Sequence, residues 1–148
     1  MKRLLLLLYI LIASASGVFA QAGLEIDQFF GEKYAKDSMV SMTRISGEQP
    51  FLRSKHLLSI STFKGNADKF AQLISPCVIH DGRNAVGRNV RYSNGVLQYA
   101  FFELRGNRYI YYIDRSSAPK PSVILIYLES DKEMSSDKVL ELIKLLSK

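Results

Sequence analysis

The stretch "NVRYSNGVLQYAFFELRGNRYIYYID", residues 89–114, decides the fold class of this 148-residue chain. Asn94-Gly95 is a strong hairpin signal, and the "RGN" that ends at Asn107 is a second place where the chain turns. The segments 96–104 and 108–114 are rich in Val, Tyr, Phe and Ile, which favour strands. The stretch therefore predicts consecutive antiparallel strands that form a meander.

Three further strands are predicted on either side of this meander. Residues 38–46 alternate polar and apolar side chains, and residues 55–63 follow them after a loop in which Pro50 blocks regular pairing. The segment "VILIYLE", residues 123–129, is apolar on both faces, as a central strand is. The proline-containing stretch "SSAPKPS", residues 116–122, is expected to connect it to the meander.

Three amphipathic segments predict helices. The first covers residues 23–37, where Ile26, Phe30 and Tyr34 recur every four residues. The second begins after Asn66, a good N-cap, and the third covers residues 135–148. The expected buried faces of the second and third helices are Phe70, Leu73, Ile74, Cys77 and Val78, and Val139, Leu142, Ile143 and Leu146.

This order of elements predicts an α+β fold with a single antiparallel sheet and helices packed mainly on one face. Residues 21–148 are expected to form one domain, because the N-terminal half has too few strands to build a core of its own.

The N-terminus has the pattern of a secretory signal peptide. Lys2 and Arg3 precede a nine-residue apolar run at residues 4–12, and Val18 and Ala20 provide the small residues of a cleavage site. We expect cleavage after Ala20. The alternative is an uncleaved anchor, since the uncharged stretch is just long enough to span a bilayer.

Cleavage would leave 128 residues and, without Lys2 and Arg3, a net charge of +4 instead of +6. We then expect a periplasmic or secreted protein with no stable membrane span. Its one cysteine excludes an internal disulfide, so its stability depends on the hydrophobic core.

The segment "SPCVIHDGRN", residues 75–84, gathers residue types that are used in catalysis. Cys77, His80 and Asp81 would suit a small hydrolase or thiol-dependent enzyme. The periodicity instead places Cys77 on the apolar face of a helix, where free cysteine behaves as a small hydrophobe. "HDGRN" is then an exposed turn in which Gly82 supplies a positive φ angle.

A metal site, a nucleotide site and an esterase-type nucleophile are not predicted. The sequence lacks a His-x-x-x-His or Cys-x-x-Cys spacing, a phosphate-binding Gly-x-x-x-x-Gly-Lys loop and a Gly-x-Ser-x-Gly elbow. We therefore expect no cofactor, no metal and no catalytic residue.

The meander is unusually rich in arginine and tyrosine. Such side chains bind phosphates and acidic groups, and an exported protein is expected to meet an envelope protein or an anionic glycan or lipid and no nucleic acid. The candidate binding residues are Arg83, Arg88, Arg91, Arg105, Arg108, Tyr109 and Tyr111. In the simpler interpretation, the aromatic residues build the sheet and the arginines cover its edges and turns.

The N-terminal sequence "LEIDQFFGEKYAKDSMVSMTRIS", after the "FAQ" of the cleavage site, resembles small exported Bacteroidetes proteins. These are grouped as domains of unknown function, in families 6108 and 4252, and the resemblance leaves the choice between the two open. It implies a periplasmic or surface location and brings no established activity and no catalytic residues.

The function expected from the sequence is an exported, non-enzymatic module that binds an envelope protein or an anionic envelope ligand. The enzyme that uses Cys77 and His80 is the alternative, and a purely structural or assembly role is a third possibility.

Overall fold

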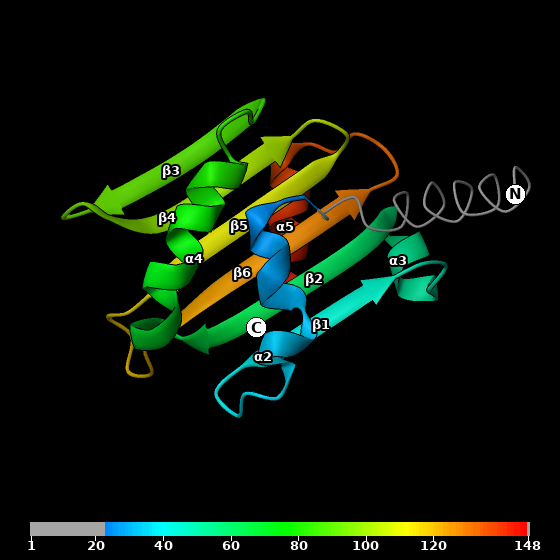
Figure 1. Ribbon diagram of the computed structural model, residues 1–148. Helices are drawn as coiled ribbons and strands as arrows, with labels where there is room; N and C mark the ends of the chain where they lie inside the picture. Colours follow the sequence, from blue (N-terminus) through cyan, green and yellow to red (C-terminus); the bar gives the residue numbers. More distant parts are fainter. Residues whose placement is uncertain (1–22, 148) are drawn as a thin grey trace, which may run out of the picture.

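The computed structural model describes residues 23–147, so the predicted signal peptide lies outside the described residues. These residues form one six-stranded sheet with helices on both faces (Figure 1). The strands are β1 (Ser41–Ser46), β2 (Leu57–Asn66), β3 (Gly87–Ser93), β4 (Val96–Leu104), β5 (Arg108–Arg115) and β6 (Ser122–Ser130). The helices are the 3₁₀ helix η1 (Glu25–Phe30), α2 (Glu32–Ala35), α3 (Pro50–Ser54), α4 (Ala67–Asp81) and α5 (Ser136–Leu146).

The sheet order is β1-β2-β6-β5-β4-β3, and every neighbouring pair is antiparallel. The strands β1 and β2 come first in the chain and pair with each other. Helix α4 then leads the chain to β3 at the opposite edge of the sheet. From there β3 to β6 return as a meander until β6 pairs with β2. The predicted α+β class with a single antiparallel sheet is confirmed.

Tight turns fix the meander as the sequence predicts. Asn94 and Gly95 both have positive φ angles, 51° and 77°, which is the geometry that a two-residue hairpin requires. Gly106 and Asn107 also have positive φ angles, 81° and 57°.

The front face of the sheet, which η1, α2 and α4 cover, carries an aromatic cluster (Figure 1). The ring of Phe63 on β2 lies 5.0 Å from that of Phe70 on α4 and 6.0 Å from that of Phe29 on η1, measured between centroids. Tyr34 closes the cluster with its ring 5.5 Å from that of Phe70. Edge-to-face pairs of this kind add to the stabilisation that burial provides.

The back face is covered by α5, with α3 at its margin (Figure 1). Val139, Leu142 and Ile143 of α5 are the buried residues of that helix. They belong to a second apolar cluster that includes Leu52, Leu57, Ile60, Phe101, Tyr109, Tyr111, Ile124, Ile126 and Leu128. The helices therefore lie mainly on the front face, as predicted, while the C-terminal helix lies alone over the middle of the back face.

Two irregularities in strand pairing redirect apolar side chains. Leu57 pairs with Ser130 and Ser59 pairs with Glu129, which leaves Leu58 as an extra residue. Because a bulge shifts the alternation of faces by one, Leu57 joins the same back-face cluster as Ile60. Gln98 is the extra residue on β4, and Leu97 there faces the front cluster.

Two N-terminal predictions are corrected. The helix expected over residues 23–37 is broken at Gly31, which is extended and separates η1 from α2. Pro50, expected in a loop, begins the short helix α3, because proline lacks the N–H that the first helical residue does not use.

Helix α4 continues through Pro76 to Asp81, and Asn66 caps it by accepting the backbone N–H groups of Asp68 and Lys69. The predicted buried face is partly wrong, because Leu73 is 49% exposed. The buried residues follow a narrower stripe, Ala67, Phe70, Ile74 and Val78. Among the described residues, no helix is long and apolar enough to cross a membrane.

The positive φ angle predicted for Gly82 is also wrong, since its φ is −84°. A Cβ atom at this position would lie 2.5 Å from the ring of Phe102 on β4. Glycine is needed here because the end of α4 lies directly on the sheet.

Candidate functional site

The seven residues predicted to bind a ligand do not form one patch. Three of them, Arg91, Tyr109 and Tyr111, belong to the back face. The guanidinium of Arg91 lies 4.6 Å from the centroid of the Tyr99 ring, and that ring contacts Tyr111 edge-on. Tyr109 and Tyr111 are buried, 4% and 9% exposed, in the cluster that α5 covers. These tyrosines pack the core of the back face.

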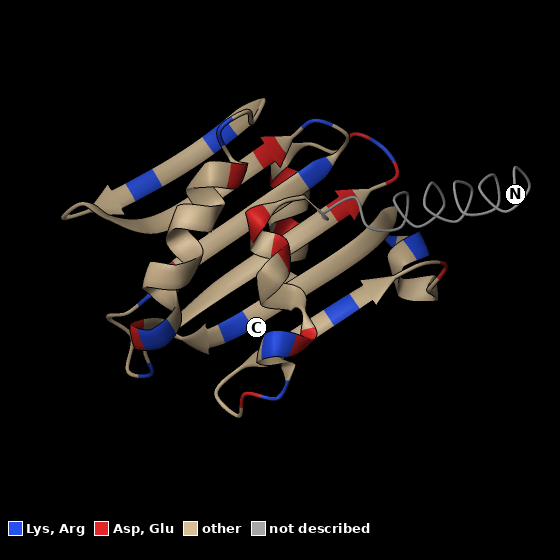
Figure 2. Cartoon of the chain, viewed as in Figure 1, with Lys and Arg blue, Asp and Glu red and all other residues tan. Residues whose placement is uncertain are grey.

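The remaining four lie elsewhere. Arg88 donates to the backbone carbonyl of Arg83 just beyond α4, and Arg108 donates to that of Arg105 at the β4–β5 turn. Figure 2 shows Lys and Arg spread over several strands and ends of the sheet. The arrangement agrees with arginines that cover edges and turns.

The second candidate, the Cys77–His80–Asp81 cluster, connects α4 to the N-terminal segment. The carboxylate of Asp81 accepts the backbone N–H groups of Glu25 and Ile26, each at 2.8 Å, and its side chain is 2% exposed. It therefore caps η1, which has no N-cap side chain of its own. His80 Nδ1 lies beside it, 3.3 Å from Asp81 and 3.5 Å from Glu25. The segment "HDGRN" thus begins inside α4, and its Asp81 side chain makes a tertiary contact with η1. The prediction of an exposed turn is therefore wrong at Asp81.

The Cys77 thiol is not prepared for nucleophilic attack. It donates to the carbonyl of Leu73, and burial, together with the nearby Glu25 and Asp81 carboxylates, raises its pKa to about 11. A catalytic thiol needs the opposite shift, because the thiolate is the nucleophile.

A third place, which the sequence did not single out, is a groove of about 770 Å³ between α5 and the α3–β2 turn. We call it the α5 groove. Its lining residues are Ser54, Lys55, His56, Lys132, Glu133, Met134, Ser135, Lys138, Glu141, Leu142, Lys144 and Leu145. This volume lies within the range of sites that hold small molecules.

Three segments bring these residues together. On one side, α3 ends at Ser54 and the chain turns into β2 through His56, whose φ angle is 58°. The carbonyl of His56 accepts the N–H of Asp131, which ties this turn to the end of β6. On the other side, Ser135 caps α5 by accepting the N–H of Lys138.

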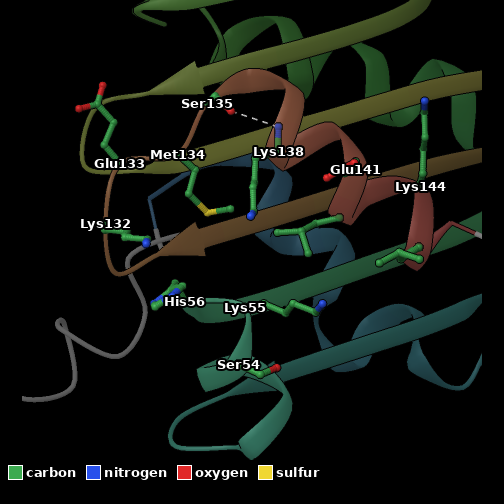
Figure 3. A pocket seen from close by; sticks show the side chains of 12 residues that line it. Ser54, Lys55, His56, Lys132, Glu133, Met134, Ser135, Lys138, Glu141 and Lys144 are labelled. Atoms are coloured by element: carbon green, nitrogen blue, oxygen red, sulfur yellow. Dashed lines mark hydrogen bonds between the residues drawn. The ribbon is translucent and has the colours of Figure 1, made fainter.

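The α5 groove is basic on balance, because its lining includes four lysines and two glutamates, Glu133 and Glu141. Lys55, Lys132 and Lys138 come from the α3–β2 turn, the segment after β6 and the first turns of α5. Figure 3 shows Lys138 pointing from α5 across the groove, whereas Glu133 and Lys144 point away from it. His56 also lines the groove, with its Nδ1 3.8 Å from the Asp131 carboxylate.

The interior of the groove is apolar. Leu142 lies at its floor, 7% exposed, and Leu145 on the next turn of α5 is 58% exposed. The other flank of α5 borders a second hollow of about 580 Å³, lined in part by Tyr99, Tyr111 and Leu140. The back-face helix therefore has open space along both sides.

Across residues 23–147, no group of three or more His, Cys, Asp or Glu side chains is placed to hold a metal ion. The groove instead offers ammonium groups around an aliphatic floor, a combination that binds negatively charged ligands and apolar groups.

Comparison with protein families gives one result. Residues 13–143 match the model of a family of unknown function, DUF6108. Of the two families that the N-terminal sequence resembles, the match confirms 6108. No curated protein and no solved structure matches the chain significantly.

Proposed function

Since the chain belongs to the DUF6108 family, whose function is unknown, we propose a function from the geometry of the site. The protein is an exported, non-enzymatic binding module that holds an anionic ligand of the cell envelope in the α5 groove. The observation that carries the proposal is that lysines from three segments surround one open groove with a leucine floor.

Opposite charge explains why an anion suits this place. Lysine ammonium groups attract phosphate and carboxylate groups, and the effect is stronger in a groove than on a flat surface because the protein walls exclude part of the solvent. Lys55 lies in the α3–β2 turn, where the hydrogen bond from the Asp131 N–H to the His56 carbonyl ties the chain to the end of β6, and Lys138 lies in the first turn of the capped helix α5. These contacts order the backbone before a ligand binds, so less conformational entropy is lost there on binding.

The proposal is tested with three variants that each remove three positive charges. The first is Lys55→Gln/Lys132→Gln/Lys138→Gln in the α5 groove. The second, Lys33→Gln/Lys36→Gln/Lys64→Gln, lies on other parts of the surface. The third, Arg83→Gln/Arg91→Gln/Arg105→Gln, removes members of the arginine set that the sequence predicted.

Co-sedimentation with phosphatidylglycerol vesicles, with phosphatidylcholine vesicles as the neutral control, compares the variants at low and physiological salt. We expect at least a tenfold loss of affinity for the first variant and less than threefold for the others. Equal losses in all three would mean general charge attraction and would overturn the groove as the site. A selective loss in the third would favour the arginine set.

Export is proposed from the N-terminal pattern. Expression of the full chain with its signal sequence, followed by intact-mass measurement, should give a protein that begins at Gln21 in the periplasmic or secreted fraction. A product that retains residues 1–20 in the membrane fraction would identify an anchor instead.

Thiol labelling tests the proposal that the protein is not a thiol-dependent enzyme. With a pKa of about 11 for Cys77, about one thiol in a thousand is ionised at pH 8, against about a quarter for an ordinary cysteine. Since the thiolate of a weaker acid is also the better nucleophile, part of this difference is offset, and we expect iodoacetamide to modify the native protein at least about tenfold more slowly than the protein in urea. Native labelling as fast as in urea would restore the thiol-enzyme hypothesis.

A further inference from the structure

We infer that the ligand of the α5 groove is an anionic amphiphile, with its acidic head on the lysines and one hydrocarbon chain along α5. This inference rests on the proposed function and adds the chemical class of the ligand. It comes from the apolar floor, which a purely ionic ligand does not need.

The exposed position of Leu145 is the first observation. Leu73 on α4 is similarly exposed, 49% against 58%, but it borders neither the α5 groove nor the hollow on the other flank of α5. Leu145 borders the groove about one turn of α5 beyond Leu142. An isolated exposed leucine needs no explanation, whereas one inside a hollow next to a buried leucine continues an apolar surface.

The geometry of α5 is the second observation. The helix has 11 residues, so it is about 16 Å long, and the groove follows it from Ser135 to Leu145. Met134 adds a flexible side chain at the end where the helix begins, and methionine adapts to irregular apolar surfaces. An alkyl chain can therefore lie beside the helix over most of its length.

The charges are the third observation. Lys138 and Lys132 lie toward the N-terminal end of α5, and Lys55 lies across the groove on the α3–β2 side (Figure 3). Leu145, seven residues along α5 from Lys138, is 58% exposed, and Glu141 lies between them in the sequence and also lines the groove. A head group and a chain thus have separate contact surfaces in the same groove, which distinguishes an amphiphile from a simple anion.

The experiment is a chain-length series of monoalkyl phosphates, butyl, hexyl, octyl and decyl, each below its micelle concentration, titrated into the full protein and followed by calorimetry. We expect the dissociation constant to fall about two- to fourfold for each added methylene, since each buried methylene adds about that factor. Amide NMR shifts should map the site to α5 and the α3–β2 turn.

A matched pair of leucine variants isolates the floor. Leu145→Ser should reduce the dependence on chain length and leave butyl phosphate binding unchanged, whereas Leu73→Ser should change neither. An unchanged chain-length dependence in Leu145→Ser would overturn the assigned position of the chain.

The two proposals fail in different ways. Alkyl phosphates that bind with the same affinity at every length, and lose it in the lysine variant, would overturn the hydrocarbon inference and leave anion binding in place. If none of the alkyl phosphates binds detectably, and the lysine variant binds vesicles as the unaltered protein does, both the anion-binding proposal and the hydrocarbon inference are overturned.

Discussion

On the front face of the sheet, η1, α2 and α4 pack over a continuous aromatic cluster, whereas on the back face α5 lies between two hollows. Asp81 fastens the front layer by binding backbone N–H groups 55 and 56 residues away in the sequence. The back layer is attached through three buried side chains of α5 and contacts at its N-terminal end, where Ser136 hydrogen-bonds Glu103 on β4.

The comparison indicates a division of roles. The aromatic cluster is closely packed and supplies much of the stability of a small domain, and the hollow of about 290 Å³ beside α4 is smaller than those on either side of α5. A helix with space along both sides contributes less to stability, and its flanks remain open for binding. We propose that the front face is the structural side and that the back face is the binding side.

The largest expected effect tests the front cluster. Phe70 is fully buried against Phe63 and Tyr34, and its ring fills the space above Gly65. Phe70→Ala should lower the free energy of unfolding by about 3–5 kcal/mol, as measured by urea denaturation.

The matched variant on the back face is Leu142→Ala. Leu142 borders the α5 groove, so water already reaches its margin, and we expect a loss of about 2 kcal/mol. A loss in Leu142→Ala as large as that in Phe70→Ala would break the distinction between the two faces.

The contact of Asp81 with η1 gives the next effect. Asp81→Asn keeps one acceptor oxygen but places an NH₂ group against a backbone N–H, so about 1.5–3 kcal/mol should be lost. Hydrogen exchange at Glu25 and Ile26 should accelerate, while exchange on α5 stays the same. Faster exchange on α5 as well would show that the two faces are not independent.

The fold was predictable because its decisive signals are local. The turn at Asn94-Gly95 and the apolar segment at 123–129 each specify their own structure, and the meander follows from them. The contact of Asp81 with Glu25 was not predictable in this way, because it joins segments 56 residues apart. The break at Gly31 likewise depends on how η1 packs.

The candidate site was harder to predict for two reasons. Lys55 and Lys132 come together only because β2 pairs with β6, which is not its neighbour in sequence. The arginine set, by contrast, could have been divided from the sequence alone: Arg88 and Arg91 are three residues apart on β3, so they point to opposite faces.

Because α4 lies close to the sheet at Gly82, we expect Gly82→Ala to lower the free energy of unfolding, by less than Asp81→Asn does. The added Cβ would meet the buried ring of Phe102 at 2.5 Å, and overpacking of this kind costs about 1–3 kcal/mol. Gly31→Ala is the control, because its Cβ would make only an ordinary contact at 3.7 Å, and its stability should change by less than about 0.5 kcal/mol. Equal losses in both variants would point to backbone flexibility instead of contact with Phe102.

The smallest effects differ in sign between the two faces. On the back face, the Tyr109 hydroxyl donates to the carbonyl of Met134 and accepts its N–H, just before α5. On the front face, the buried Tyr112 hydroxyl has no hydrogen-bond partner among the described residues. Tyr109→Phe should therefore lower the free energy of unfolding by about 0.5–1.5 kcal/mol, whereas Tyr112→Phe should leave it unchanged or raise it by up to about 1 kcal/mol.

Both changes are measured as shifts of the urea midpoint, with the m value, the slope of the unfolding free energy against urea concentration, unchanged. The difference in sign matters because it separates apolar packing from hydrogen bonding. On the front face, removal of the buried Tyr112 hydroxyl removes the cost of its missing hydrogen bond. On the back face, the Tyr109 hydroxyl holds the segment before α5 through hydrogen bonds with Met134. A loss in Tyr112→Phe equal to that in Tyr109→Phe would mean that a buried water satisfies the Tyr112 hydroxyl. The front face would then hold an internal polar site next to the hollow beside α4 that Tyr112 borders, and the contrast between the two faces would be weaker.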